Sequence, residues 1–174
     1  MKPLVVGVDP GAGGALALYD PNAKKLLFAE NLKTKVEIIG GKERARLDWF
    51  GVDEQFQKAA LFGATECLIE DVSGVVGQSA SASFTFGFTT CVTHAAARYA
   101  GLRVQKIRPQ DWKPKLRVPG KTKLAPKAYT EAIVGKADEI FPDASRMFRG
   151  PKGGKLLDVA EAALIAYYGA HYIV

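Results

Sequence analysis

Four acidic side chains have the type and placement to form a metal-dependent catalytic site. Asp9 ends one apolar run and Glu70 ends another. Asp158 and Glu161 open the last apolar segment and are three residues apart, which places them on one face of a helix. Carboxylates beside buried chain are costly unless they are paired, protonated or bound to a cation. If the fold brings the four acids together, their oxygens suit Mg²⁺ or Mn²⁺.

The chemistry expected of such a cluster is phosphodiester hydrolysis with two divalent ions. Two ions about 3.5–4 Å apart can activate a water and stabilise the leaving 3′-oxygen. Taken singly, each acid has a simpler explanation: Asp9 precedes Pro-Gly and could open a turn, and acids are common in the first turn of a helix. Adjacent Glu70 and Asp71 should point to opposite faces of a strand, so Glu70 is favoured and Asp71 is the alternative.

Basic side chains are concentrated in residues 103–127, which carry nine basic residues and one acid, in a chain of net charge +6. A concentrated basic patch favours a polyanion, most commonly nucleic acid, although a solvated lysine-rich surface would have the same composition. A second basic stretch lies in residues 142–155. The side chains predicted to contact DNA are Lys106, Arg108, Lys113, Lys115, Arg117, Lys121, Lys123, Lys152 and Lys155. The lysines that could bind the scissile phosphate are Lys123, Lys127, Lys152 and Lys155.

The length and composition predict one soluble globular domain that spans residues 1–174. No apolar stretch reaches the roughly 18 residues that a membrane span needs, and no signal peptide is visible, so no membrane partner is expected. Cys67 and Cys91 lie in apolar surroundings, which predicts two buried, reduced thiols in a cytoplasmic protein. Trp112 is expected in the core, and His94 is expected to be a packing or interface residue.

The elements that must position the acids follow from hydrophobic periodicity and turn residues. Strands are expected at residues 3–9, 15–20, 24–30, 66–71 and 102–107, and helices at about 47–62, 79–100, 123–135 and 155–172. Residues 33–45 are polar and contain glycine, which predicts a loop, and residues 142–155 are expected to form a mobile loop. This order predicts an α/β fold, with a five-stranded mixed sheet and helices on both faces.

The acidic motifs resemble those of the RuvC family of Holliday-junction resolvases. The similar segments are Val6-Gly7-Val8-Asp9-Pro10-Gly11, Leu68-Ile69-Glu70 and Asp158-Val159-Ala160-Glu161-Ala162, in the family's order and at about its spacing. The stretch 120–134 is also similar, and Lys127 falls where the family has an active-site lysine. The resemblance implies an RNase H-like fold, a homodimer, and Mg²⁺- or Mn²⁺-dependent nicking of two strands of a four-way DNA junction.

The same resemblance implies roles for individual residues. Asp9, Glu70, Asp158 and Glu161 become the ligands of two ions, Lys127 contacts the phosphate, and the paired nicks leave 5′-phosphates. Glu161 departs from the family, which usually has Asp there. Ser73, with Gly74 and Gly77 nearby, stands where the family tends to carry an aromatic residue that stacks on junction bases.

Three alternatives to a junction resolvase stay open at this point. The first is another RNase H-like nuclease, acting on flaps, branched DNA or RNA–DNA hybrids. The second is a non-catalytic junction-binding protein whose acids are structural. The third is an actin-like sugar kinase, because such kinases share the Gly-x-Asp-x-Gly opening; the chain is short for their two-domain cleft and lacks a second phosphate motif.

Overall fold

The computed structural model describes residues 1–11, 13–71 and 79–174. Its central sheet has five strands in the order β3-β2-β1-β6-β7. The strands are β1 (Leu4–Asp9), β2 (Ala15–Asp20), β3 (Lys25–Asn31), β6 (Ala64–Glu70) and β7 (Arg103–Ile107). β2 pairs antiparallel with β1 and with β3, whereas β6 runs parallel to β1 and to β7. The predicted five-stranded mixed sheet is therefore confirmed.

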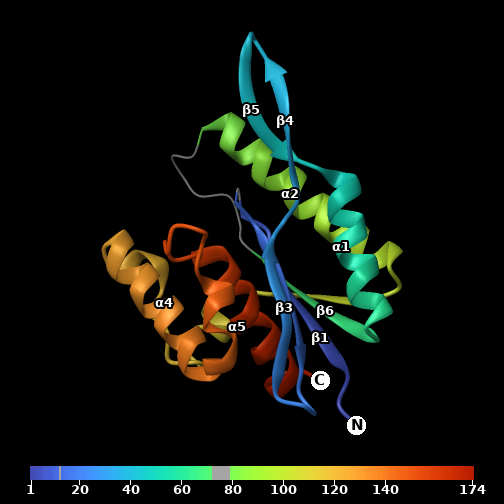
Figure 1. Cartoon of the computed structure of the whole chain (residues 1–174), viewed down its shortest axis with the longest axis vertical. Helices are drawn as coiled ribbons and strands as arrows, with labels where there is room; N and C mark the ends of the chain where they lie inside the picture. The colour runs from blue at the N-terminus through green and yellow to red at the C-terminus, as the bar shows by residue number, and fades with distance from the viewer. Residues whose placement is uncertain (12, 72–78) are drawn as a thin grey trace.

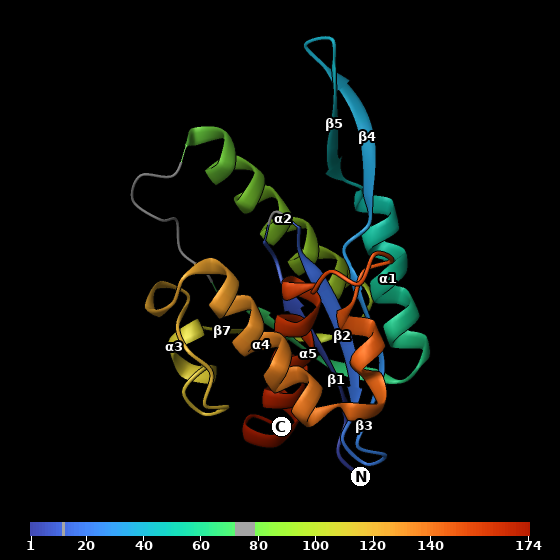
Figure 2. The same cartoon turned by 60° about the vertical axis from the view of Figure 1, so that its left-hand side comes forward.

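Helices cover both faces of this sheet, as the two views show (Figures 1 and 2). α1 (Trp49–Leu61) and α2 (Ala80–Tyr99) lie on one face, and α4 (Pro126–Ile140) and α5 (Leu157–Tyr172) on the other. Successive strand residues point to opposite faces, so Val5 packs into the core beneath α4 and α5 and Val6 into the core beneath α1 and α2. Within the described residues, no helix is both long enough and apolar enough to cross a membrane.

The connections after β7 contain three short helices. These are α3 (Pro109–Trp112) and the 3-10 helices η1 (Lys121–Lys123) and η2 (Pro142–Phe148). The stretch 142–155, predicted to be a mobile loop, thus begins with η2, whose Phe148 is buried in the core. Arg149 and Lys155 form an isolated antiparallel bridge in the same stretch. The burial of Phe148 anchors the first half of this stretch against the core, despite the Pro, Gly and Lys content of the stretch.

α5 approaches β1 closely because Gly7 has no side chain. A Cβ atom at Gly7 would overlap the carbonyl oxygen of Ala162 and the backbone nitrogen of Ala166. α5 is rich in alanine and almost entirely buried, so its backbone can lie directly against the strand. This contact holds α5, which carries two of the four acids, along the strand that ends at Asp9.

The prediction of a loop at residues 33–45 is wrong. β4 (Thr34–Ile39) and β5 (Lys42–Leu47) form a separate two-stranded antiparallel sheet. Gly40 and Gly41 both have positive φ, as the tight type I′ turn of a hairpin requires. In both views the hairpin extends away from the rest of the molecule (Figures 1 and 2). Residues 35–38 and 44–47 do alternate polar and apolar side chains, but these runs are short and most of the hairpin is exposed, so its polar and glycine content favours a loop at the level of sequence.

The two cysteines differ in exposure. Cys67 is buried, as predicted, whereas Cys91 is exposed, so the prediction of two buried thiols is wrong for Cys91. Cys91 lies on α2, which buries Thr89, Thr93, Ala96 and Ala97 along one side only. An Ala-rich sequence predicted the helix but did not show which side of it faces the core.

Candidate active site

The parallel pairing of β1 and β6 brings two acids to the same edge of the sheet. Asp9 is the last residue of β1 and Glu70 is the last residue of β6. The two side chains are 6% and 5% exposed, respectively. The carboxyl ends of parallel strands meet at one edge, which is the usual place for a binding site in an α/β sheet.

The first turns of α5 add two further acids to this edge. Asp9, Asp158 and Glu161 each offer a carboxylate oxygen, and these atoms all lie within 4.8 Å of one another. Glu161 is buried and Asp158 is half-buried. Three carboxylates at this spacing provide the all-oxygen donor set that Mg²⁺ and Mn²⁺ prefer.

Glu70 lies beside these three acids. It contacts the last residue of α3, Trp112, and the residue that follows it, Lys113. Trp112 Nε1 donates a hydrogen bond of 2.8 Å to Glu70 Oε1, and Lys113 Nζ lies 3.7 Å from the same oxygen. Trp112 is fully buried, so its predicted place in the core is confirmed. Its indole nitrogen also orients a carboxylate of the site, a contact that the sequence did not indicate.

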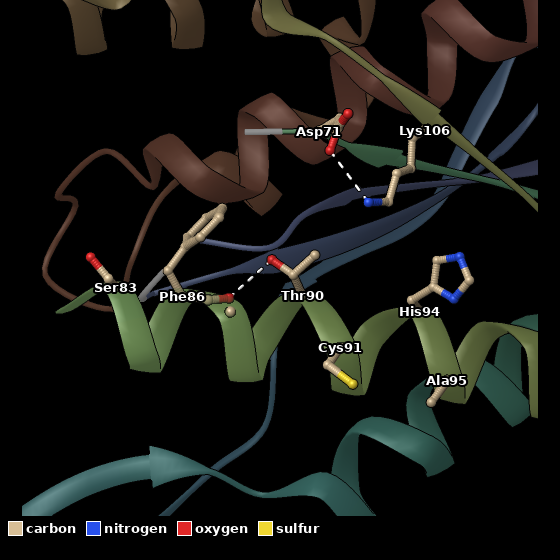
Figure 3. A pocket seen from close by; sticks show the side chains of 9 residues that line it. Asp71, Ser83, Phe86, Thr90, Cys91, His94, Ala95 and Lys106 are labelled. Carbon is tan, nitrogen blue, oxygen red and sulfur yellow. Dashed lines mark hydrogen bonds and ion pairs between the residues drawn. The ribbon is translucent and has the colours of Figure 1, made fainter. Parts of the chain in front are cut away.

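Asp71, the alternative to Glu70, belongs to a different cavity. Its Oδ1 lies 3.4 Å from Lys106 Nζ, and both residues line a hollow of about 620 Å³ beside α2 (Figure 3). His94 lines the same hollow and is separated from the acidic cluster. The structure therefore places Glu70 with the other three acids and turns Asp71 away, as expected for adjacent residues at the end of a strand.

A buried lysine and a buried tyrosine hold Glu161. Lys113 Nζ donates hydrogen bonds to Glu161 Oε1 at 2.8 Å and to the Tyr129 hydroxyl at 2.7 Å. The Tyr129 hydroxyl donates to the same Glu161 oxygen at 2.6 Å. Lys113 is only 6% exposed, which does not agree with its predicted role as a surface contact for DNA. Its ammonium instead offsets part of the negative charge of the cluster.

Burial and mutual repulsion raise the pKa values of three of the acids. The pKa of Asp9 lies well above its usual 3.8, because of burial first and then the neighbouring carboxylates, with Glu161 foremost. Burial and then the charge of Glu161 likewise raise the pKa of Asp158. For Glu70, burial raises the pKa while the nearby Lys113 ammonium lowers it. The cluster therefore holds more negative charge than its protein partners neutralise, and a divalent cation fits this imbalance.

The four acids lie in a cleft of about 1290 Å³ with a basic rim. Its walls are the first turns of α2, including Ser81 and Thr85, and the segment from α3 to η1, including Lys121 and Lys123. Lys121 is close enough that its charge offsets a part of the rise in the pKa values of Glu70 and Asp158 that burial causes. An acidic floor beneath a basic rim can hold a cation and a phosphodiester together.

The other predicted basic residues lie outside this cleft or at its approaches. Lys127 is exposed in the first turn of α4, and Lys115, Arg117 and Lys152 are also exposed. Three of the remaining residues are paired with acids: Lys106 with Asp71, Arg108 with Asp111, and Lys155 with Glu131. Ser73, Gly74 and Gly77, which bear on base stacking, fall outside the described residues.

The sheet order, the helices on both faces and the acids at the strand ends define an RNase H-like α/β fold. Two solved structures of Thermus thermophilus RuvC share this fold. One, in complex with a Holliday junction substrate, is 16% identical over 97% of this chain and 94% of that chain, with a TM-score of 0.66. The other is 18% identical over 95% of each chain, with a TM-score of 0.53. No family model and no curated protein matches the sequence.

Proposed function

We propose that this protein is a metal-dependent endonuclease that resolves four-way DNA junctions by paired nicks. The observation that supports this most strongly is the carboxylate cluster of Asp9, Asp158 and Glu161 at the floor of a basic-rimmed cleft. The Thermus thermophilus RuvC that shares the fold was solved with a Holliday junction substrate, which favours a branched DNA over other phosphodiesters. A DNA substrate also agrees with the cytoplasmic location predicted from the sequence.

The four acids would hold two Mg²⁺ or Mn²⁺ ions; Asp9 on β1 neighbours both the strand that ends at Glu70 and the two acids of α5. When bound, such ions lower the pKa of water and stabilise the charge that develops on the leaving 3′-oxygen, so that cutting leaves 5′-phosphates. Lys113 and Tyr129 orient the Glu161 carboxylate, and Trp112 orients that of Glu70. Such supporting hydrogen bonds fix ligands in place before a metal binds.

The basic residues would bind the phosphate backbone of the DNA on either side of the cleavage site. Lys121 and Lys123 at the rim and Lys127 at the start of α4 are proposed to contact the scissile phosphate and its neighbours. Lys106, Arg108, Lys115, Arg117, Lys152 and Lys155 are proposed to contact the junction arms. A homodimer would present two equivalent sites to the two symmetric strands of a junction.

Cleavage of an end-labelled four-way junction tests this proposal. We expect symmetric paired nicks in Mg²⁺ or Mn²⁺, nicks that DNA ligase can reseal because they carry 5′-phosphates, and no product in EDTA. Faster cutting of a flap or an RNA–DNA hybrid would identify a different RNase H-like nuclease. Tight junction binding without cutting in either metal would identify a non-catalytic binding protein.

A further inference from the structure

The β4–β5 hairpin has two chemically different faces. Residues directly opposite each other in an antiparallel pair share a face. The pairs on one face are Lys35–Arg46, Glu37–Arg44 and Ile39–Lys42, and the pairs on the other are Thr34–Leu47, Val36–Ala45 and Ile38–Glu43. The first set, called the basic face below, thus carries four basic side chains and one acid.

The hairpin projects from the molecule, and Leu47 at its base packs against the core beneath α1 and α2. Nine of its twelve strand residues are exposed, and in both views it extends beyond the helices (Figures 1 and 2). Each strand has six residues, which corresponds to a length of about 20 Å. A lone two-stranded hairpin is only marginally stable in water, so an extension of this kind gains little for the fold itself. Lys35 is ion-paired with Glu37 at 3.0 Å. Lys42 and Arg44 in the outer half, by contrast, are exposed to a partner.

The base of the basic face adjoins the wall of the acidic cleft. Arg46 Nη1 donates a hydrogen bond of 3.5 Å to Thr85 Oγ1 of α2, and Thr85 is one of the residues that line the cleft. The basic face therefore begins beside the candidate active site and continues outward from it. A duplex that enters the cleft and leaves past the N-terminal turns of α2 would run along this face.

We propose that the basic face of the β4–β5 hairpin binds the phosphate backbone of a duplex DNA arm that leaves the cleft. The inference rests on the proposed function, because the cleft is what brings DNA to the hairpin. Lys and Arg are the usual phosphate contacts, and the major groove of B-DNA admits a two-stranded ribbon. A ribbon of about 20 Å spans roughly six base-pair steps.

Charge favours DNA over a second copy of this chain as the occupant of the basic face. Two basic faces brought together would repel each other, whereas a polyanion complements them. A second copy could instead cover the opposite face, where Val36 is 67% exposed and Ile38 is 78% exposed. A dimer formed through Val36 and Ile38 is therefore the alternative to DNA binding by the hairpin.

The decisive variant is Lys42→Gln/Arg44→Gln, which removes two charges from the outer half of the basic face. The matched control is Lys24→Gln/Lys25→Gln, which removes the same charge from the exposed end of the turn between β2 and β3 and the first residue of β3, at the opposite end of the molecule (Figure 1). Binding of a fluorescent long-armed junction is measured in EDTA, so that no cutting occurs. We expect the hairpin variant to bind about tenfold more weakly at about 0.1 M salt, with a salt slope smaller by about 2, and the control to change by less than about twofold.

Arm length separates an arm contact from a general loss of affinity. When the arms are shortened stepwise, the difference between wild-type protein and the hairpin variant should disappear once an arm is too short to reach the hairpin. A loss of affinity that is the same for every arm length, or the same in the control, would overturn the proposal. So would an unchanged affinity of the hairpin variant. A third variant, Val36→Ser/Ile38→Ser, should leave binding intact; loss of binding together with a change of oligomeric state would instead assign the hairpin to a second copy.

Cutting by the same proteins in Mg²⁺ distinguishes failure of this inference from failure of the proposed function. If the wild type makes paired nicks and Lys42→Gln/Arg44→Gln binds the junction as tightly as the wild type, the proposed hairpin contact is wrong and the proposed nuclease activity is supported. If binding depends on the hairpin but no nicking occurs, the proposed hairpin contact is supported and the proposed nuclease activity is wrong. A wild type that binds no duplex-armed DNA would overturn both.

Discussion

The acidic cleft and the β4–β5 hairpin carry their charges in opposite environments. In the cleft, Asp9 and Glu161 are buried beside one another, and their mutual repulsion adds to the cost of burial. On the hairpin, Lys42 and Arg44 are exposed to solvent. Buried charges interact strongly at short range, whereas exposed charges are screened and act mainly on a polyanion. We therefore expect changes in the cleft to alter chemistry and stability, and changes in the hairpin to alter affinity alone.

The largest effect is expected from Asp9→Asn. The substitution keeps the size of the side chain but removes a carboxylate that lies close to the other three acids, so nicking of a four-way junction should fall on the order of 10³-fold or more. Junction binding in EDTA should persist, because the basic rim is unchanged. Single-turnover cleavage and fluorescence anisotropy measure the two quantities.

Asp71→Asn is the matched control for this prediction. Asp71 follows Glu70 directly but pairs with Lys106 at the other cavity (Figure 3). Its removal should change the nicking rate by less than about threefold. Normal nicking by Asp9→Asn would contradict the proposed metal site, and a large loss in Asp71→Asn would contradict the assignment of Glu70 over Asp71.

The next largest effect is a loss of stability in Gly7→Ala. Because a Cβ at Gly7 would overlap backbone atoms of α5, helix and strand must separate, and we expect a loss of about 3 kcal/mol in the free energy of unfolding. Gly135→Ala is the control, since no heavy atom lies within 4 Å of the added Cβ and the position is exposed on α4. That variant should be neutral or more stable by about 0.5–1 kcal/mol. Equal effects in urea unfolding would contradict the close approach of α5.

The sequence contains enough information to predict the elements that carry the acids. Asp9 and Glu70 each end an apolar run. Such runs predict buried strands, and acids at the carboxyl ends of two parallel strands lie at the same edge of the sheet. Asp158 and Glu161 share a helix face by their spacing alone. The strand and helix positions that these residues need were predicted to within a few residues.

Contacts between distant segments could not be predicted from the sequence. Lys113 falls within a basic stretch, and nothing local shows that its ammonium is buried against Glu161, 48 positions away. Tyr129 has the periodicity of an ordinary core residue of α4. The hairpin was missed for a different reason: beyond the contacts at its base, such as that of Arg46 with Thr85, its strands are mostly exposed, and the short alternating runs beside the two glycines of its turn are also compatible with a polar loop.

The third prediction concerns the pH dependence of stability without metal. The pKa of Asp9 is raised above its unfolded value near 3.8, so the folded protein binds this proton more tightly than the unfolded chain. The stabilisation is complete below that unfolded value and is lost as the pH rises through the folded pKa. At pH 7.5 in EDTA, Asp9→Asn should therefore raise the Tm by several degrees, at about 2–4 °C per kcal/mol, and the gain should shrink toward pH 4.

Glu43→Gln on the exposed hairpin is the control for the pH experiment. Its carboxylate lies in solvent, so the free energy of unfolding should stay within about 0.5 kcal/mol of wild type at every pH. Thermal unfolding followed by circular dichroism from pH 4 to pH 8 checks both variants. A gain in Asp9→Asn that is the same at both ends of this range would show that the cost of ionising the buried Asp9 carboxyl beside the other acids is not its cause.

The smallest effect on stability is expected from removing most of the hairpin. Thr34 and Leu47 are register partners at its base, so an Asn-Gly turn can join them in place of residues 35–46. The core beneath α1 and α2 keeps its residues, and the free energy of unfolding should change by less than about 1 kcal/mol. Nicking of a short-armed junction should match the wild type, because the four acids and their supporting residues are untouched. A large loss of stability would show that the hairpin is part of the fold, and slow nicking of the short-armed substrate would show that it acts on the cleft and not on a DNA arm.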